Sequence, residues 1–222
     1  MPKLSNRVDH FTDSVIRRMT RIANAYGAIN LSQGFPDFAP PKEILDALAN
    51  ITYNGSSHQY TITYGSYNLR SALARKHGKA INRVIDPDKE VVITCGGTEA
   101  MMCAMMTVCN PGDKVIIFSP FYENYMADTI LSGANPIYVP LNPPNYSFDR
   151  QVLEDAFKQN VKAIVICNPS NPSGKVFTRE ELEFIGKLAL KYDVYIITDE
   201  VYEHIIYEPF SHVHMAGIPG MY

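Results

Sequence analysis

The chain has 222 residues, of which 46% are hydrophobic and 19% charged, a composition typical of a globular protein with a buried core. Its 20 basic and 23 acidic residues give a net charge of -3, which disfavours DNA or RNA as a partner. No apolar run of about 18 residues is present and the first residues lack an apolar signal core, so neither a membrane span nor a signal peptide is predicted.

The first 90 residues are predicted to be irregular apart from three helices. One helix lies near residues 12–26, and a second begins after Pro41, where apolar residues recur at helical spacing. Residues 55–65 indicate a loop. A third helix is expected near residue 70, and Gly78 is expected to close it.

From residue 90 onward, short β-branched runs alternate with amphipathic helices. This alternation is typical of an α/β fold, a mainly parallel sheet sandwiched by helices. The last helix carries the capping-box pattern Thr178-x-x-Glu181. In such sheets, ligands bind at the carboxyl ends of the strands. The predicted strands are 91–94, 114–118, 136–139, 162–167 and 194–198, and the predicted helices are 99–109, 122–131, 149–157 and 178–192.

The first strand end that could form a site is the turn Gly96-Gly97-Thr98. Glycines allow a ligand to approach the backbone closely, and the N–H groups at a helix N-terminus suit a phosphate. The same turn is also compatible with a plain strand–helix connection capped by Thr98. Both interpretations remain open on this turn alone.

Two further strand ends carry polar side chains. In CNPSNPSGKV (167–176), proline restricts the residue before it, which could hold the Asn171 carboxamide in one direction or could be plain turn chemistry. The strand 194–198 ends in Asp199 and Glu200, and carboxylates are seldom buried without a partner. Asp199 is therefore expected to face a cation, with a cap or a salt bridge as the alternative, and Glu200 could equally be the buried member of the pair.

A strand followed by Asp-Glu also occurs in P-loop ATPases, which need G-x-x-x-x-G-K-[ST] upstream. The nearest stretch has Pro169 at the first glycine position and Val176 at the last. These two mismatches argue against an ATPase.

The histidines and cysteines are the residues that bear on metal binding and on the redox compartment. His212 and His214 could bind a metal from one strand face, but no third ligand is evident nearby, so surface or loop histidines and no metal site are expected. None of the four cysteines forms a C-x-x-C pair, which disfavours a zinc ribbon, and a reducing, cytoplasmic compartment is the simplest interpretation.

Six segments of the chain occur in the order found in one enzyme family. Through them the chain resembles the class I PLP-dependent aminotransferases of fold type I, in the branch with aromatic, kynurenine, methionine and aspartate aminotransferases. The resemblance spans nearly the whole chain. The segments are INLSQGFPDF (29–38), QYTITYGSYNLR (59–70), CGGTEA (95–100), SPFYENY (119–125), NPSNPSGKV (168–176) and DEVYEHI (199–205).

The resemblance implies pyridoxal 5'-phosphate as cofactor. Asp199 would pair with its protonated ring nitrogen, so that the ring can accept electrons from the substrate. Tyr202 and Asn171 would hydrogen-bond its phenolic oxygen. These carried-over roles make Asp199 and Tyr202 the expected catalytic residues.

The resemblance also implies how the rest of the cofactor is held. Gly97, Thr98 and Glu99 would offer backbone N–H groups, and Thr98 its hydroxyl, to the phosphate. Tyr122 would stack on the ring, although Phe121 beside it leaves the register open by one residue.

Substrate and partner contacts follow from the same resemblance. Gly34 and Asn171 would contact the substrate, an amino acid or a 2-oxo acid. Tyr60 would reach the phosphate of a partner subunit, which implies a homodimer. Residues 1–45 would form an N-terminal arm and part of the small domain, and 46–222 an incomplete PLP-binding large domain.

The chain departs from the family pattern in one respect. The Schiff-base lysine of the family lies downstream of the DEVY segment, in a Ser-x-x-Lys context that this sequence does not contain. The 222-residue chain is therefore expected to be truncated. Because that lysine is the expected base of the reaction, the chain is also expected to have little activity alone. Transamination is the expected reaction of the parent enzyme; a C–S β-lyase of the same fold and a non-catalytic binding or assembly protein are the alternatives.

Overall fold

The computed structural model describes residues 2–11 and 13–222. The chain divides into two compact units, one ending at Thr63 and one spanning Tyr64–Tyr222. Each unit is described by itself, and the functional division predicted at residue 45 stays a prediction.

The first unit contains the first two predicted helices. These are α1 (Val15–Tyr26), which ends at Gly27 in the left-handed conformation, and α2 (Lys42–Thr52). Both confirm the periodicity in the sequence, although Thr12, where the first helix was expected to begin, lies outside the described residues. Two short 3-10 turns complete the unit, η1 (Asn6–His10) and η2 (Gly55–His58).

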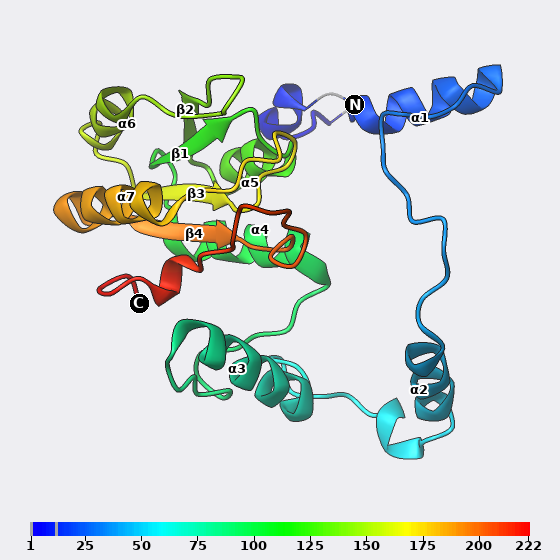
Figure 1. Cartoon of the computed structure of the whole chain (residues 1–222). Helices are drawn as coiled ribbons and strands as arrows, with labels where there is room; N and C mark the ends of the chain where they lie inside the picture. The colour runs from blue at the N-terminus through cyan, green and yellow to red at the C-terminus, as the bar shows by residue number, and fades with distance from the viewer. Residues whose placement is uncertain (1, 12) are drawn as a thin grey trace. The chain divides into compact units, whose positions relative to one another are not determined.

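A parallel sheet of four strands forms the centre of the second unit (Figure 1). The strands lie in the order β2-β1-β3-β4, and each neighbouring pair is parallel, which confirms the predicted α/β fold. The register pairs Cys167 with Asp199, so the carboxyl ends of β3 and β4 lie side by side. The strands are β1 (Lys114–Ser119), β2 (Asn135–Pro140), β3 (Ala163–Cys167) and β4 (Tyr195–Asp199).

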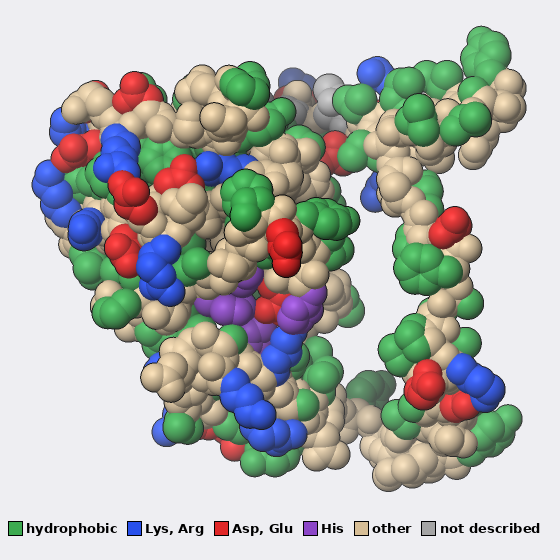
Figure 2. All heavy atoms as spheres, in the orientation of Figure 1, with side chains coloured by type: hydrophobic (Ala, Val, Ile, Leu, Met, Phe, Trp, Pro, Cys, Tyr) green, Lys and Arg blue, Asp and Glu red, His purple; other side chains and the backbone are tan. Residues whose placement is uncertain are grey.

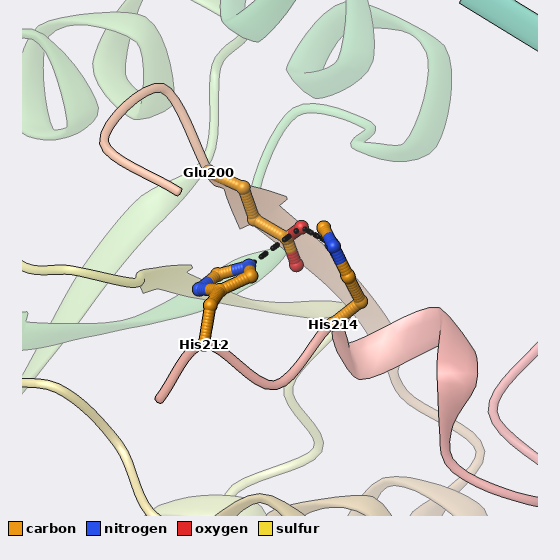
Figure 3. Close-up of side chains that lie close together, drawn as sticks. All are labelled: Glu200, His212 and His214. Carbon is orange, nitrogen blue, oxygen red and sulfur yellow. Dashed lines mark hydrogen bonds and ion pairs between the residues drawn. The ribbon is translucent and has the colours of Figure 1, made fainter. Parts of the chain in front are cut away.

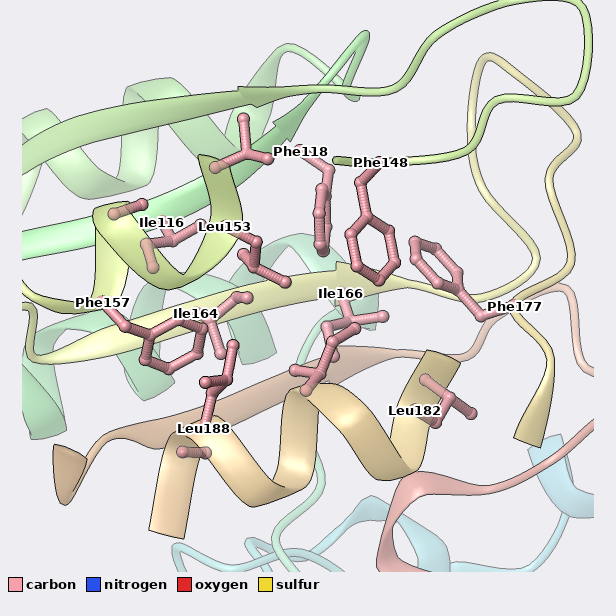
Figure 4. Packing of buried hydrophobic residues seen from close by; sticks show 14 of the residues in the cluster. Ile116, Phe118, Phe148, Leu153, Phe157, Ile164, Ile166, Phe177, Leu182 and Leu188 are labelled. Atoms are coloured by element: carbon pink, nitrogen blue, oxygen red, sulfur yellow. The ribbon is translucent and has the colours of Figure 1, made fainter. Parts of the chain in front are cut away.

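Helices cover both faces of this sheet, and successive strand residues point alternately to one face and the other. Ile116 and Ile164 belong to a core cluster with residues of α6 (Arg150–Phe157) and α7 (Arg179–Tyr192), shown in Figure 4. The alternate residues of β1 and β3 pack with α4 (Gly96–Val108) and α5 (Asn124–Leu131). Two cores, one on each face, therefore hold the strand ends in place.

The N-termini of α6 and α7 are capped as their sequences indicate. Thr178 accepts a hydrogen bond from the Glu181 N–H at 3.2 Å, and the Glu181 carboxylate accepts one from the Thr178 N–H at 2.9 Å. The predicted capping box is thus confirmed. Asp149 caps α6 by accepting from the N–H groups of Gln151 and Val152.

The predicted strand at Val91–Thr94 is wrong. The segment forms no strand: the Ile93 N–H donates to the Tyr64 carbonyl at 3.0 Å, and the Thr94 carbonyl accepts from the Gly96 N–H at 2.8 Å within the following turn. A β-branched run becomes a strand only when a neighbouring strand completes a ladder of such bonds. None of the four strands in the described part of the chain provides that ladder.

The prediction that Gly78 closes the third helix is also wrong. That helix, α3 (Tyr67–Ile81), continues through Gly78 and ends at Asn82, which adopts the left-handed conformation. A Cβ at Gly78 would lie 2.5 Å from the carbonyl oxygen of Arg83. Glycine is therefore needed here because the returning chain packs against the helix.

No helix in the described ranges is long and apolar enough to cross a membrane.

Candidate functional site

Asp199 is the last residue of β4, and its carboxylate is held by two donors. The Tyr125 hydroxyl donates to Oδ2 at 2.8 Å, and the Val201 N–H donates to Oδ1 at 3.2 Å. Both donors are neutral, so the carboxylate is oriented while its charge remains available to a cation. The bond from Val201 corresponds to the turn-cap alternative, and the expectation that Asp199 faces a cationic group stays a prediction.

Tyr125 was missed by the sequence analysis. Burial, reinforced by Cys167 and Asp199, raises the pKa of its hydroxyl well above the ordinary value. The phenol therefore stays protonated and donates to Asp199. The sequence carries only a weak signal for it, since Tyr125 is the last residue of the family segment SPFYENY (119–125).

The N-terminus of α4 lies beside the end of β4. This helix begins at Gly96, three residues earlier than predicted, so Gly97, Thr98 and Glu99 lie in its first turn. A Cβ on Gly97 would lie 3.5 Å from the side chain of Val201, which follows Asp199 by two residues. The positive end of a helix dipole is thereby placed close to the Asp199 carboxylate.

The start of α5 connects these two features. Asn124 donates to the Thr98 hydroxyl at 3.4 Å, and the next residue, Tyr125, donates to Asp199. Thr98 does not cap α4, whose N-cap is Cys95, and the Glu99 carboxylate instead accepts from the Cys95 N–H. The hydroxyl of Thr98 therefore faces α5 and the strand ends.

The loop after β3 is held by Asn168 rather than by Asn171. The buried Asn168 side chain accepts from the Phe177 N–H at 3.0 Å and donates to the Val213 carbonyl at 3.3 Å. Its own N–H donates to the backbone oxygen of Asp199 at 2.9 Å. Asn168 thus couples the loop to β4.

Asn171 is half-buried on the same side of the sheet. Its N–H donates to the Cys167 sulfur at 3.4 Å, and it lines a small pocket with Phe121, Tyr125 and Cys167. The pocket volume is about 10 Å³, which holds no more than a water molecule. A larger ligand would have to lie above the strand ends rather than inside this pocket.

Neighbouring aromatic rings distinguish Tyr122 from Phe121. Phe121 is stacked on Tyr138 of β2, with centroids 5.2 Å apart and planes 1° apart. Tyr122 meets Tyr125 edge to face at 5.8 Å. Tyr122 therefore contacts Tyr125, the hydrogen-bond partner of Asp199, while Phe121 packs on Tyr138 of the sheet.

The remaining predicted site residues lie in two places. Tyr202 is half-buried in the turn after β4, where its carbonyl accepts from the Ile205 N–H at 2.8 Å. Gly34 and Tyr60 are exposed residues of the first unit. The second unit thus supplies every predicted site residue except Gly34 and Tyr60.

His212 and His214 lie in a loop, as expected, but their side chains are only 9% and 17% exposed. Both rings donate to the carboxylate of Glu200, as Figure 3 shows. The expectation that no third ligand-type group lies nearby is therefore wrong, and Glu200 is that group. It follows β4 directly, so its distance from the histidines is set by the returning chain and not by sequence spacing.

Comparisons with known proteins identify the family of the chain. The sequence model of the family described as "Aminotransferase class I and II" matches residues 26–219. Kynurenine–oxoglutarate transaminase 3 of Rattus norvegicus is 35% identical over 99% of this chain and 51% of its own length. A probable N-succinyldiaminopimelate aminotransferase of Mycobacterium tuberculosis is 35% identical over 97% of this chain and 55% of its own.

Solved structures of similar proteins show the same fold. N-succinyldiaminopimelate aminotransferase from Mycobacterium tuberculosis superimposes with a TM-score of 0.91 at 35% identity, over 99% of this chain and 57% of that one. A methionine aminotransferase from Escherichia coli gives 0.92 at 29% identity, over 100% and 57%. The chain spans about half the length of the curated relatives it matches.

Proposed function

The chain belongs to the class I and II aminotransferases, and from this premise we propose that it forms most of the cofactor-binding part of a PLP-dependent enzyme. The proposed reaction transfers an amino group between an amino acid and a 2-oxo acid. The observation that carries the proposal is the hydrogen bond from Tyr125 to Asp199, beside the N-terminus of α4. The Asp199 carboxylate would pair with a cation, and the N-terminus of α4 would bind a phosphate.

The donor set of the second unit fits pyridoxal phosphate. The first turn of α4 presents Gly97, Thr98 and Glu99, and helix N-termini bind phosphate through free N–H groups and the helix dipole. The carboxylate of Asp199 suits a protonated pyridine nitrogen. Asn171 and Tyr202 suit the phenolic oxygen.

The bound cofactor would supply an electron sink that stabilises negative charge at the substrate Cα. Asp199 would keep the proton on the ring nitrogen, and Tyr125 would keep Asp199 oriented through its hydroxyl. Tyr122 would cover one face of the ring, and the engagement of Phe121 with Tyr138 supports this choice of register. Lys175 is paired with Glu181 at 2.8 Å, so it is not assigned the Schiff-base role.

Substrate contacts, assembly and location belong to the same proposal. We assign Gly34 and Asn171 to the substrate and Tyr60 to the cofactor phosphate of a partner subunit, which requires a homodimer. The relatives bear names that point to kynurenine, N-succinyldiaminopimelate and methionine, so an amino acid or its 2-oxo acid is the proposed substrate class. The four free cysteines support a reducing, cytoplasmic compartment.

Asp199→Asn tests the proposed cofactor site. Pyridoxamine 5'-phosphate is a more specific probe than pyridoxal 5'-phosphate, because it lacks the aldehyde that reacts with surface lysines. Loss of a charge-assisted hydrogen bond is expected to weaken its binding about 10- to 100-fold, measured by equilibrium dialysis. Asp155→Asn is the matched control, since Asp155 is exposed on α6 and belongs to the opposite face of the sheet. Equal binding by both variants would refute the proposal.

Tyr125→Phe is expected to weaken binding of the same probe about 3- to 10-fold, because it removes one hydrogen bond to Asp199 and leaves the charge in place. The effect should disappear in the Asp199→Asn background, since Tyr125 acts through Asp199. Dialysis of the two single variants and the double variant measures this coupling. Additive losses would show that Tyr125 has a separate role.

A further inference from the structure

Glu200, His212 and His214 form a compact cluster next to the proposed cofactor site (Figure 3). The Glu200 Oε2 atom lies 3.2 Å from Nε2 of His212 and 2.5 Å from Nδ1 of His214. The two rings meet edge to face with centroids 4.4 Å apart. One ligand-type atom from each residue lies within 4.8 Å of the other two. The three side chains therefore converge on one point.

The spacing of these atoms approaches that of a zinc coordination shell. Zinc–ligand bonds of about 2.0–2.1 Å at tetrahedral angles place the ligand atoms roughly 3.3 Å apart. The separation of Glu200 from His212 already has this value, and His214 needs a small rotation away from the carboxylate. Two histidines and one glutamate leave the fourth position to water, as in other three-ligand zinc sites.

The surroundings of His214 favour a cation at its Nδ1 atom. When neutral His214 donates from Nδ1 to Glu200, its Nε2 lone pair faces a Glu203 carboxylate oxygen 3.6 Å away, which is repulsive. Metal bound at Nδ1 moves the proton to Nε2, where it can donate to Glu203. A histidine ligand supported by a second carboxylate is the usual arrangement in metal sites.

The local charge also favours a cation. Glu200 and Glu203 bring two negative charges, and Lys76 of α3 pairs with Glu203, so one negative charge, that of Glu200, is left without a cationic partner while the histidines are neutral. The carboxylate of Glu200 is only 18% exposed, and such a group needs compensating positive charge. Figure 2 shows histidine side chains gathered beside acidic ones on the visible face. The side chains of His214 and Glu200 remain 17% and 18% exposed, so an ion can reach them from solvent.

We propose that Glu200, His212 and His214 bind a divalent transition-metal ion of the zinc class, with Glu203 supporting His214 from outside the coordination shell. The ion would tie the chain at 212–214 to the end of β4, one residue after Asp199. It would not take part in amino-group transfer, and the proposal does not depend on the proposed function.

Metal titration of the untagged 222-residue chain tests the site. Zn²⁺ is followed by calorimetry, and Co²⁺ by the intense visible absorption that four-coordinate cobalt displays. One equivalent per chain is expected to bind, with the visible Co²⁺ band lost on adding Zn²⁺. Glu200→Gln and His214→Ala are each expected to weaken binding at least about 100-fold, and Glu203→Gln about 10-fold.

His204→Ala is the matched control. Its side chain is 75% exposed and next to Glu203, but it is not one of the three ligands, so binding should be unchanged. Far-UV circular dichroism checks that each variant folds, and His212→Gln serves if His214→Ala does not. Absence of binding by the parent chain would overturn the proposal. Binding that persists in Glu200→Gln and His214→Ala would overturn it too, by placing the ion elsewhere.

Discussion

Phe157→Ala is expected to lower the free energy of unfolding of the second unit by about 3–5 kcal/mol, because it opens a cavity in a close-packed core. Phe157 is 1% exposed at the end of α6 and packs in the cluster with Leu153, Ile164 and Leu188 shown in Figure 4. Its ring also lies 6.0 Å from that of Tyr192 on α7. Urea unfolding followed by far-UV circular dichroism measures the change as a lower midpoint.

Val152→Ala is the matched control for this effect, since Val152 lies on the same helix with 44% of its surface exposed. Its unfolding free energy should change by no more than about 0.5 kcal/mol. If Phe157→Ala behaved like this control, α6 would not be packed on the sheet as described.

Asp128→Asn is expected to change how stability depends on pH. Asp128 is 4% exposed on α5, its Oδ2 atom has no hydrogen-bond partner among the described residues, and burial raises the pKa of its carboxyl to about 6 from 3.8. A raised carboxyl pKa means that the folded state binds the proton more tightly than the unfolded state. Stability is therefore lost as the pH rises from 3.8 to about 6, by about 3 kcal/mol in all.

The measurement is the unfolding free energy of variant minus parent, at pH values from 4 to 8. This difference is expected to rise by about 2.5 kcal/mol across the range, because part of the change lies below pH 4, whatever constant cost the asparagine adds. Asp155→Asn is the control: hydrogen bonds from Lys158 and Gln151 lower the pKa of this exposed carboxyl, so its difference should not rise with pH. A flat profile for Asp128→Asn would show that the carboxyl is solvated or paired in solution.

The elements of the fold that depend on neighbouring residues were predictable from the sequence. Helical spacing and the Thr178-x-x-Glu181 pattern reflect interactions within one or two turns, and α7 follows both. The strands were recognised where apolar runs are buried on both faces, as in β3. The run Val91–Thr94 has the same local pattern but no ladder, and no local pattern reports the presence of a neighbouring strand.

The candidate site was likewise predictable from the sequence only in part. The sequence was sufficient to identify the family and the strand ends, because these follow from motifs and their order, whereas the pairing of Asp199 with a cation stays a prediction. Only the tertiary structure showed that Tyr125 holds Asp199 from 74 residues away, and that Glu200 meets His212 and His214. Such contacts depend on strand register and helix packing, which sum over the whole core, so the pairs of residues they bring together cannot be deduced from their spacing along the chain.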